Sequence, residues 1–126
     1  MNLEGHERIL VLKPSSLGDI VHTLPAVSAI QRQFPEIEID WLANTEWLPL
    51  IEGMPFLRKT IGFPRKQFRG PGGLLRARNW ANETFTSSEY DLALDFQGLL
   101  RSALLAKMSG AKKRIGFSQA RDCLLY

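Results

Sequence analysis

The chain has little of several residue types, and each shortage excludes a class of protein. Its 126 residues include one cysteine, Cys123, so no disulfide can form within the chain, as is usual in a reducing compartment. No apolar run approaches the roughly eighteen residues needed to cross a bilayer as a helix, and residues 1–8 lack the apolar core of a signal peptide. We therefore expect a cytoplasmic protein whose residues 1–126 form one domain.

The motifs of several common ligand sites are also missing. Cysteine, histidine and carboxylate residues do not cluster with metal-ligand spacing, and no Ser-His-Asp arrangement can be assembled. The turn at residues 13–19 is neither the Gly-rich loop of nucleoside triphosphatases nor the fingerprint of dinucleotide-binding proteins. No cofactor and no metal ion are expected.

Acidic residues are absent between Glu52 and Glu83, although the formal net charge of the chain is only +3. Basic residues and glycines crowd the middle of this segment, which includes Arg65, Lys66, Arg69, Arg76 and Arg78. Such a segment is either a solvated surface or a site for an anion. Few aromatic residues are interleaved with the cations, which argues against nucleic acid as a partner and favours a small polyanion.

Hydrophobic patterns predict an α/β fold. Residues 9–12 form the unbroken aliphatic run of a strand that is covered on both faces, and residues 20–34 repeat apolar side chains at helical spacing, with a kink expected at Pro25. Residues 36–42 alternate polar and apolar, which predicts a strand with one less buried face. Three further strands are predicted at residues 56–63, 90–96 and 113–117, with helices at residues 45–51 and 98–110. The expected fold is a Rossmann-like parallel sheet, in the order 3-2-1-4-5, with helices on both faces.

The polar turn from Lys13 to Asp19 joins the first strand to the first helix. α/β proteins place their ligand sites at such turns. Its serines, Ser15 and Ser16, and Gly18 place hydroxyl and backbone N–H groups at a helix start, where an anion is favoured. Asp19 would be favoured there by the helix dipole even without a function.

Three stretches resemble glycosyltransferase family 9, the ADP-heptose:lipopolysaccharide heptosyltransferases. The first is Lys-Pro-Ser-Ser-Leu-Gly-Asp-Ile-Val-His-Thr-Leu-Pro-Ala at residues 13–26. Residues 95–103 resemble the second signature of the family, and residues 114–117 with Arg121 resemble the third. Within the family, the similarity is greatest to the members that add the first heptose, the heptosyltransferase I group.

The resemblance implies a GT-B fold, in which two Rossmann-like domains face each other across a cleft. This chain is similar to the N-terminal, acceptor-binding domain alone, and the C-terminal donor-binding domain is absent from the residues given. The implied reaction transfers heptose with inversion from ADP-heptose to the Kdo region of the lipopolysaccharide inner core. The isolated 126-residue chain is expected to be inactive, and the alternatives are a non-catalytic module that binds anions or sugars and a nucleotide-binding Rossmann domain.

The resemblance also implies roles for individual residues. Asp19 matches the catalytic aspartate and would act as the general base, while His22 and Asp95 would position the residues that bind substrate, or else pack and cap locally. The acceptor, a Kdo-lipid A type molecule with carboxylates and phosphates, would be bound by Lys13, Ser15, Ser16, Gly18, Arg65, Lys66, Arg69, Gln97 and Arg121. Lys13 and Gln97 fit structural roles equally well. Basic residues would allow peripheral contact with the inner face of the inner membrane.

Overall fold

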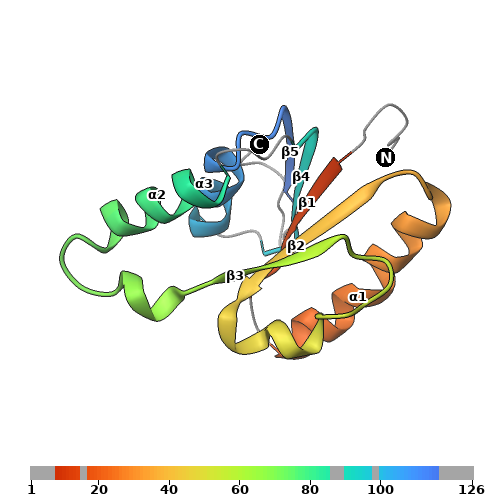
Figure 1. Ribbon diagram of the computed structural model, residues 1–126, viewed down its shortest axis with the longest axis horizontal. Coiled ribbons are helices and arrows are strands. Elements are labelled where there is room, and N and C mark those ends of the chain that lie inside the picture. Colours follow the sequence, from red (N-terminus) through yellow and green to blue (C-terminus); the bar gives the residue numbers. More distant parts are fainter. Residues whose placement is uncertain (1–7, 15–16, 86–89, 98–99, 117–126) are drawn as a thin grey trace.

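Five parallel strands form a single sheet in the order β3-β2-β1-β4-β5 (Figure 1). The computed structural model describes residues 8–14, 17–85, 90–97 and 100–116. The predicted strand order is confirmed, and each pair of neighbours is parallel. The strands are β1 (Arg8–Leu12), β2 (Glu38–Asn44), β3 (Lys59–Phe63), β4 (Leu92–Asp95) and β5 (Lys113–Gly116).

Helices cover both faces of the sheet, as predicted. Helix α1 (Leu17–Gln33) packs through Ile20 and Val27 on one face, while α2 (Gly73–Thr84) and α3 (Leu100–Met108) pack on the other (Figure 1). Successive residues of a strand point to opposite faces of the sheet. Strand β1 therefore contributes Ile9 and Val11 to one apolar cluster and Leu10 and Leu12 to the other. The fold is therefore an α/β sandwich with two separate cores.

Helix α1 runs without interruption through Pro25 and begins at Leu17, three residues earlier than the predicted start. The short helix predicted at residues 45–51 is a 3₁₀ helix, η1 (Thr45–Leu50), and a second one, η2 (Arg65–Phe68), precedes α2. The side chain of Asn44 does not cap η1. In the part of the chain that the structure describes, no helix has the length and apolar character of a membrane-spanning segment.

Strand β2 corrects one prediction. Its sequence alternates, yet every residue after Glu38 is buried, because β1 and β3 flank the strand and helices cover both of its faces. Asp40 has no exposed surface. A carboxylate can be buried only when other groups replace the water that it loses.

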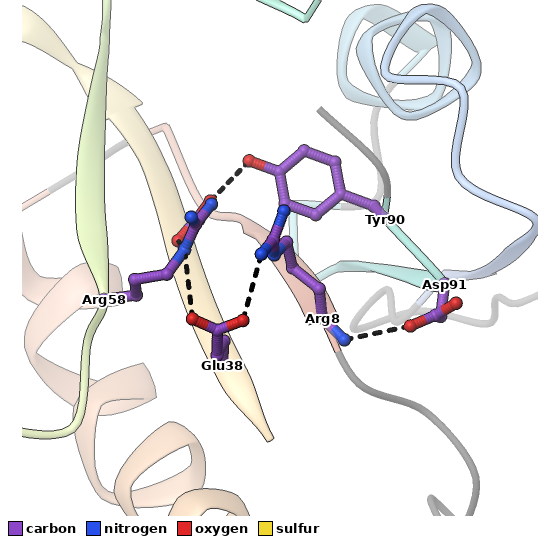
Figure 2. Close-up of polar contacts among 6 residues, drawn as sticks. Arg8, Glu38, Arg58, Tyr90 and Asp91 are labelled. Carbon is purple, nitrogen blue, oxygen red and sulfur yellow. Dashed lines mark hydrogen bonds and ion pairs between the residues drawn. The ribbon is translucent and has the colours of Figure 1, made fainter. Parts of the chain in front are cut away.

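Two side chains supply that replacement for Asp40 (Figure 2). Arg58 donates from Nε to Oδ1 at 2.9 Å and from Nη2 to Oδ2, and the Tyr90 hydroxyl donates to Oδ2 at 2.6 Å. The three residues come from β2, from the residue before β3 and from the segment before β4. The hydrogen bond to Asp40 is the main cause of a raised pKa for the Arg58 guanidinium.

Further polar contacts lie near the Asp40 cluster, at the amino ends of the strands (Figure 2). Arg8 pairs with Glu38 at 3.0 Å, and its backbone N–H donates to the carboxylate of Asp91 at 3.0 Å. These contacts join the amino ends of β1, β2 and β4. The polar network therefore holds the sheet together at the edge opposite the strand carboxyl ends.

Candidate functional site

The carboxyl ends of all five parallel strands lie along one side of the sheet, which we call the carboxyl-end edge. The strand order reverses its direction between β1 and β4. Successive strands add on one side of β1 up to β3, and then β4 and β5 add on the other side. The register pairs Leu12 with both Leu42 and Asp95, so the turns after β1 and β4 lie beside each other. This reversal is the usual position of a ligand crevice in an open parallel sheet.

Lys13 lies at this edge and is 8% exposed. Its Nζ donates to the backbone carbonyl of Phe96 at 3.2 Å, and its own carbonyl accepts from the indole N–H of Trp41 at 3.3 Å. These contacts give Lys13 a structural role between β1, β2 and β4. An ammonium has three N–H donors, so a contact with an anion remains compatible with this position.

The turn after β4 is held by Asp95. Its buried carboxylate accepts a hydrogen bond from the backbone N–H of Gln97 at 2.9 Å, which fixes the backbone of the turn. The Oε1 atom of Gln97 is buried and has no hydrogen-bond partner among the residues that the structure describes. Gln97 therefore presents an amide oxygen that none of the described residues uses as an acceptor.

The start of α1 brings Gly18 and Asp19 to the surface. A side-chain carbon at Gly18 would meet nothing within 4 Å, so packing within the described part of the chain does not require glycine there. Thr23 is buried, and its hydroxyl donates to the carbonyl of Asp19 at 2.7 Å, a contact that no motif in the sequence indicates. His22 is exposed on the same helix, one turn after Asp19.

The predicted basic residues lie on η2 and just after it. Arg65 pairs with Glu46 at 3.3 Å, and with Lys66 it lines a cleft of about 310 Å³ at the carboxyl ends of β2 and β3. Lys66 and Arg69 are exposed, and neither has an ion pair within the described part of the chain. Of the predicted basic residues that the structure describes at this site, Lys66 and Arg69 can therefore meet an anionic ligand without breaking an ion pair.

Buried polar atoms without a hydrogen-bond partner gather at this edge. In the residues described, four such side-chain atoms occur, and three belong to the carboxyl-end edge: Oδ1 of Asn44, Nε of Arg65 and Oε1 of Gln97. The fourth is Nε of Arg8 at the opposite edge. Folded proteins satisfy nearly all such groups, so the concentration of exceptions here favours a ligand site.

Arg76 has a different role from the other cations of the basic segment. Its guanidinium donates to three backbone carbonyls, those of Gln67, Arg69 and Pro71, at 2.7–3.1 Å. The carbonyl of Phe68 also lies so close to Gly73 that a side-chain carbon there would approach it to 1.9 Å. The segment between η2 and α2 is thus folded around Arg76 and packed against Gly73. From the sequence, Arg76 was predicted only as one cation of a basic segment.

We expect Arg76→Ala to loosen this segment by about 1–2 kcal/mol, because three charge-assisted hydrogen bonds are lost, although the residue is exposed. Limited proteolysis should then cut residues 65–72 faster than in the wild type. Arg78→Ala is the matched control, since Arg78 is exposed on the same helix and has no ion pair in the described structure. Equal cleavage rates for the two variants would contradict the role given to Arg76.

Three of the predicted site residues, Ser15, Ser16 and Arg121, lie outside the described residues. Of the others, Lys13, Gln97 and Asp95 lie at the reversal of strand order, and Arg65 and Lys66 line the cleft beside β3. The rest belong to neither group: Gly18, Asp19 and His22 lie on α1, and Arg69 follows η2. Among the residues described, no group of three or more histidine, cysteine and acidic side chains could hold a metal ion.

Comparison with known proteins identifies the family of this chain. The model of glycosyltransferase family 9 (heptosyltransferase) matches residues 81–126. Lipopolysaccharide heptosyltransferase 1 of Pseudomonas aeruginosa is 34% identical over 106 residues, which are 82% of this chain and 30% of that protein. The chain belongs to glycosyltransferase family 9. The Escherichia coli lipopolysaccharide heptosyltransferase 1 is 29% identical over 122 residues, covering 93% of this chain and 38% of that protein.

Solved structures of family 9 proteins share the fold. The structure of E. coli heptosyltransferase WaaC with ADP-2-deoxy-2-fluoro heptose matches with a TM-score of 0.73 and 27% identity, covering 93% of this chain and 39% of that chain. The chain spans about a third of the length of the curated relatives that it matches. The family assignment that residues 13–26, 95–103 and 114–117 suggested is confirmed.

Proposed function

We propose that the chain is the N-terminal, acceptor-binding domain of an inverting heptosyltransferase that transfers heptose from ADP-heptose to the Kdo region of the lipopolysaccharide inner core. The observation that carries this proposal is the similarity to lipopolysaccharide heptosyltransferase 1 over most of the chain. The carboxyl ends of the strands support it, because Lys13, Asp95 and Gln97, which belong to the stretches that resemble the family signatures, lie there. We expect the protein to act at the inner face of the inner membrane, because the proposed acceptor is attached to a lipid.

In the proposed reaction, an acceptor hydroxyl oxygen forms a bond to the anomeric carbon of heptose while the bond from that carbon to the ADP oxygen breaks. Asp19 takes the proton that the hydroxyl loses. Its place on the exposed first turn of α1 suits this role, because a base must reach a substrate that lies outside the protein core. ADP leaves from the opposite face of the sugar, which accounts for inversion.

The acceptor is recognised in this proposal through its negative charges. Kdo carries a carboxylate and lipid A carries phosphates, and Lys66 and Arg69 offer exposed cations beside the cleft that Arg65 lines. A guanidinium matches a carboxylate or phosphate through paired hydrogen bonds. The buried oxygens of Asn44 and Gln97 lie at the same edge, where sugar hydroxyls can donate to them after a small adjustment of the ligand site.

We expect Lys66→Ala to weaken binding of Kdo-lipid A about tenfold and to reduce the dependence of that binding on salt, because a screened charge contact is removed. Calorimetric titration of the chain with detergent-dispersed Kdo-lipid A at several salt concentrations measures both effects. Lys113→Ala is the control, since Lys113 is exposed at the amino end of β5, away from the strand carboxyl ends.

The same titration separates the alternatives. Unchanged affinity in Lys66→Ala would mean that the basic segment is a solvated surface and does not bind the acceptor. Tight binding of ATP or NAD that Kdo-lipid A does not affect would favour a nucleotide-binding domain instead. Heptose transfer measured in a protein that joins this chain to a donor-binding domain distinguishes an enzyme from a module that only binds the acceptor.

A further inference from the structure

Thr23 places a hydroxyl on the core-facing side of α1. The buried residues of that helix are Ile20, Thr23 and Val27, so the threonine occupies a position between two aliphatic side chains. Burial of a hydroxyl costs free energy unless a hydrogen bond replaces the water that it loses. Valine has nearly the same shape and would avoid this cost. Packing of the helix on the sheet therefore does not require the hydroxyl.

The hydroxyl of Thr23 donates to the backbone carbonyl of Asp19 at 2.7 Å. In an α-helix this carbonyl is also the acceptor for the backbone N–H four residues later, which is the N–H of Thr23 itself. A hydroxyl that bonds to the carbonyl four residues earlier adds a second donor and bends the helix at that turn. The contact therefore acts on the peptide of the residue that we propose as the general base.

Proline weakens α1 close to the same turn. Pro25 lies inside the helix and has no N–H, so it cannot donate to the carbonyl of Val21, four residues earlier. The first turn of α1 is therefore joined to the rest of the helix by fewer backbone hydrogen bonds than in a helix without proline. The hydroxyl of Thr23 adds a hydrogen bond next to this weak point.

Strand β2 holds the chain before Asp19. The backbone N–H of Lys13 donates to the carbonyl of Leu42 at 3.2 Å, and the backbone N–H of Asn44 donates to the carbonyl of Pro14 at 2.9 Å. The sheet thus fixes the chain where it leaves β1. The threonine hydroxyl is bonded to the backbone at Asp19 itself, on the helix side of the turn.

We propose that Thr23 is a positioning residue for heptose transfer, because its hydroxyl holds the first turn of α1 and so fixes the direction of the Asp19 carboxylate. This inference rests on the proposed function, in which Asp19 is the base. A base must lie within hydrogen-bond reach of the proton that it takes, and a displacement of about 1 Å can lower the rate by roughly a hundredfold. Thr23 is buried and acts on the reaction through Asp19.

Two substitutions at Thr23 separate positioning from stability. Thr23→Val removes the hydroxyl, so the protein should be at least as stable as the wild type, while the transfer rate kcat should fall about tenfold. Thr23→Ser keeps the hydroxyl but loses a buried methyl, so stability should fall, while kcat should stay within about twofold of the wild type. The KM for the acceptor should change in neither variant. Rates and urea unfolding are measured in one protein that joins this chain to a donor-binding domain.

Hydrogen exchange of the backbone amides of α1 gives a second readout, which does not need the reaction. Thr23→Val should speed exchange at residues 21–23 relative to the rest of the helix, because the first turn opens more easily, and Thr23→Ser should not. If the joined wild-type protein transfers no heptose, the proposed function fails. The exchange data still decide whether Thr23 holds the first turn.

Thr60→Val is the matched control, because it makes the same chemical change on β3, away from α1. It should alter neither the transfer rate nor the exchange of α1. Three results would overturn the proposal: a wild-type rate and wild-type exchange in Thr23→Val, an equal loss of rate in Thr23→Ser, or a loss of rate in Thr23→Val that follows a loss of stability.

Discussion

Replacing Asp19 by asparagine is expected to lower the rate of heptose transfer by about a thousandfold, within the range for loss of a general base. Asparagine keeps the size and the helix-start position of aspartate but cannot accept the proton of the acceptor hydroxyl. Binding of Kdo-lipid A should change little, because the proposed binding groups are the cations of η2. Transfer is measured in a protein that joins this chain to a donor-binding domain, with binding measured in parallel.

Two further variants make this result specific to the position of the carboxylate. Glu36→Gln removes an exposed carboxylate beyond the other end of α1 and should leave the rate unchanged. Asp19→Glu keeps the proton acceptor but moves it, so a partial rate is expected. A near-normal rate in Asp19→Asn would remove Asp19 as the base, and a rate loss explained entirely by weaker acceptor binding would assign it to recognition instead.

Replacing Arg58 by methionine is expected to lower the free energy of unfolding by about 3 kcal/mol. Asp40 has no exposed surface, so loss of the guanidinium would leave its carboxylate buried with only the Tyr90 hydroxyl as a described side-chain donor. Arg58 itself is 31% exposed at its side chain, which lowers the expected cost below that of a fully buried pair. Urea unfolding followed by circular dichroism measures the difference.

The controls for Arg58→Met test whether burial of Asp40 is the cause. Lys112→Met breaks the exposed pair with Asp91 and should change stability by less than about 0.5 kcal/mol. Adding Asp40→Asn to Arg58→Met removes the buried charge and should restore part of the lost stability. A loss as small as that of Lys112→Met would mean that water replaces the guanidinium.

The pH dependence of this pair follows from the direction of the pKa shift. The hydrogen bond with Asp40, against the opposing effect of burial, raises the pKa of Arg58 in the folded state. A group whose pKa is raised on folding stabilises the folded state fully at every pH below its pKa in the unfolded chain. This stabilisation is lost only as pH rises through the pKa of the group in the folded protein. The contribution of the charged Arg58 is therefore constant across the neutral range, and the destabilisation of Arg58→Met should not vary between mildly acidic and mildly alkaline pH through this group.

Much of the fold could be predicted because the local signals agree with one another. The aliphatic run of residues 9–12 can be buried on both faces only at the centre of a parallel sheet, and the turn that follows it carries the family signature. The prediction for β2 was wrong because alternation shows which residues are polar, not whether a partner exists for them. Asp40 is buried because Arg58 and Tyr90, distant in sequence, meet it in the fold.

The basic segment shows the same limit at the candidate site. Sequence alone identified a group of cations without acids between Glu52 and Glu83. It could not separate Arg76, which donates to three backbone carbonyls, from Lys66 and Arg69, which have no ion pair in the described part of the chain. That separation depends on where the chain turns back on itself after η2, and no local pattern encodes the distance from a side chain to a carbonyl several residues away.

The sequence by itself determined the α/β class, the strand order, the family and the position of Asp19 at a helix start. The class and the helix start follow from short-range patterns, because periodicity and turn motifs act over a few residues. The strand order follows from the connection rules of parallel sheets, and the family follows from the resemblance of three stretches. Only the tertiary structure decided which charges are buried and paired, which cations stay accessible, and that Leu74 and Leu75 remain in contact with solvent beside an apolar groove. The physical reason is that burial and charge pairing are set by contacts between segments far apart in the chain.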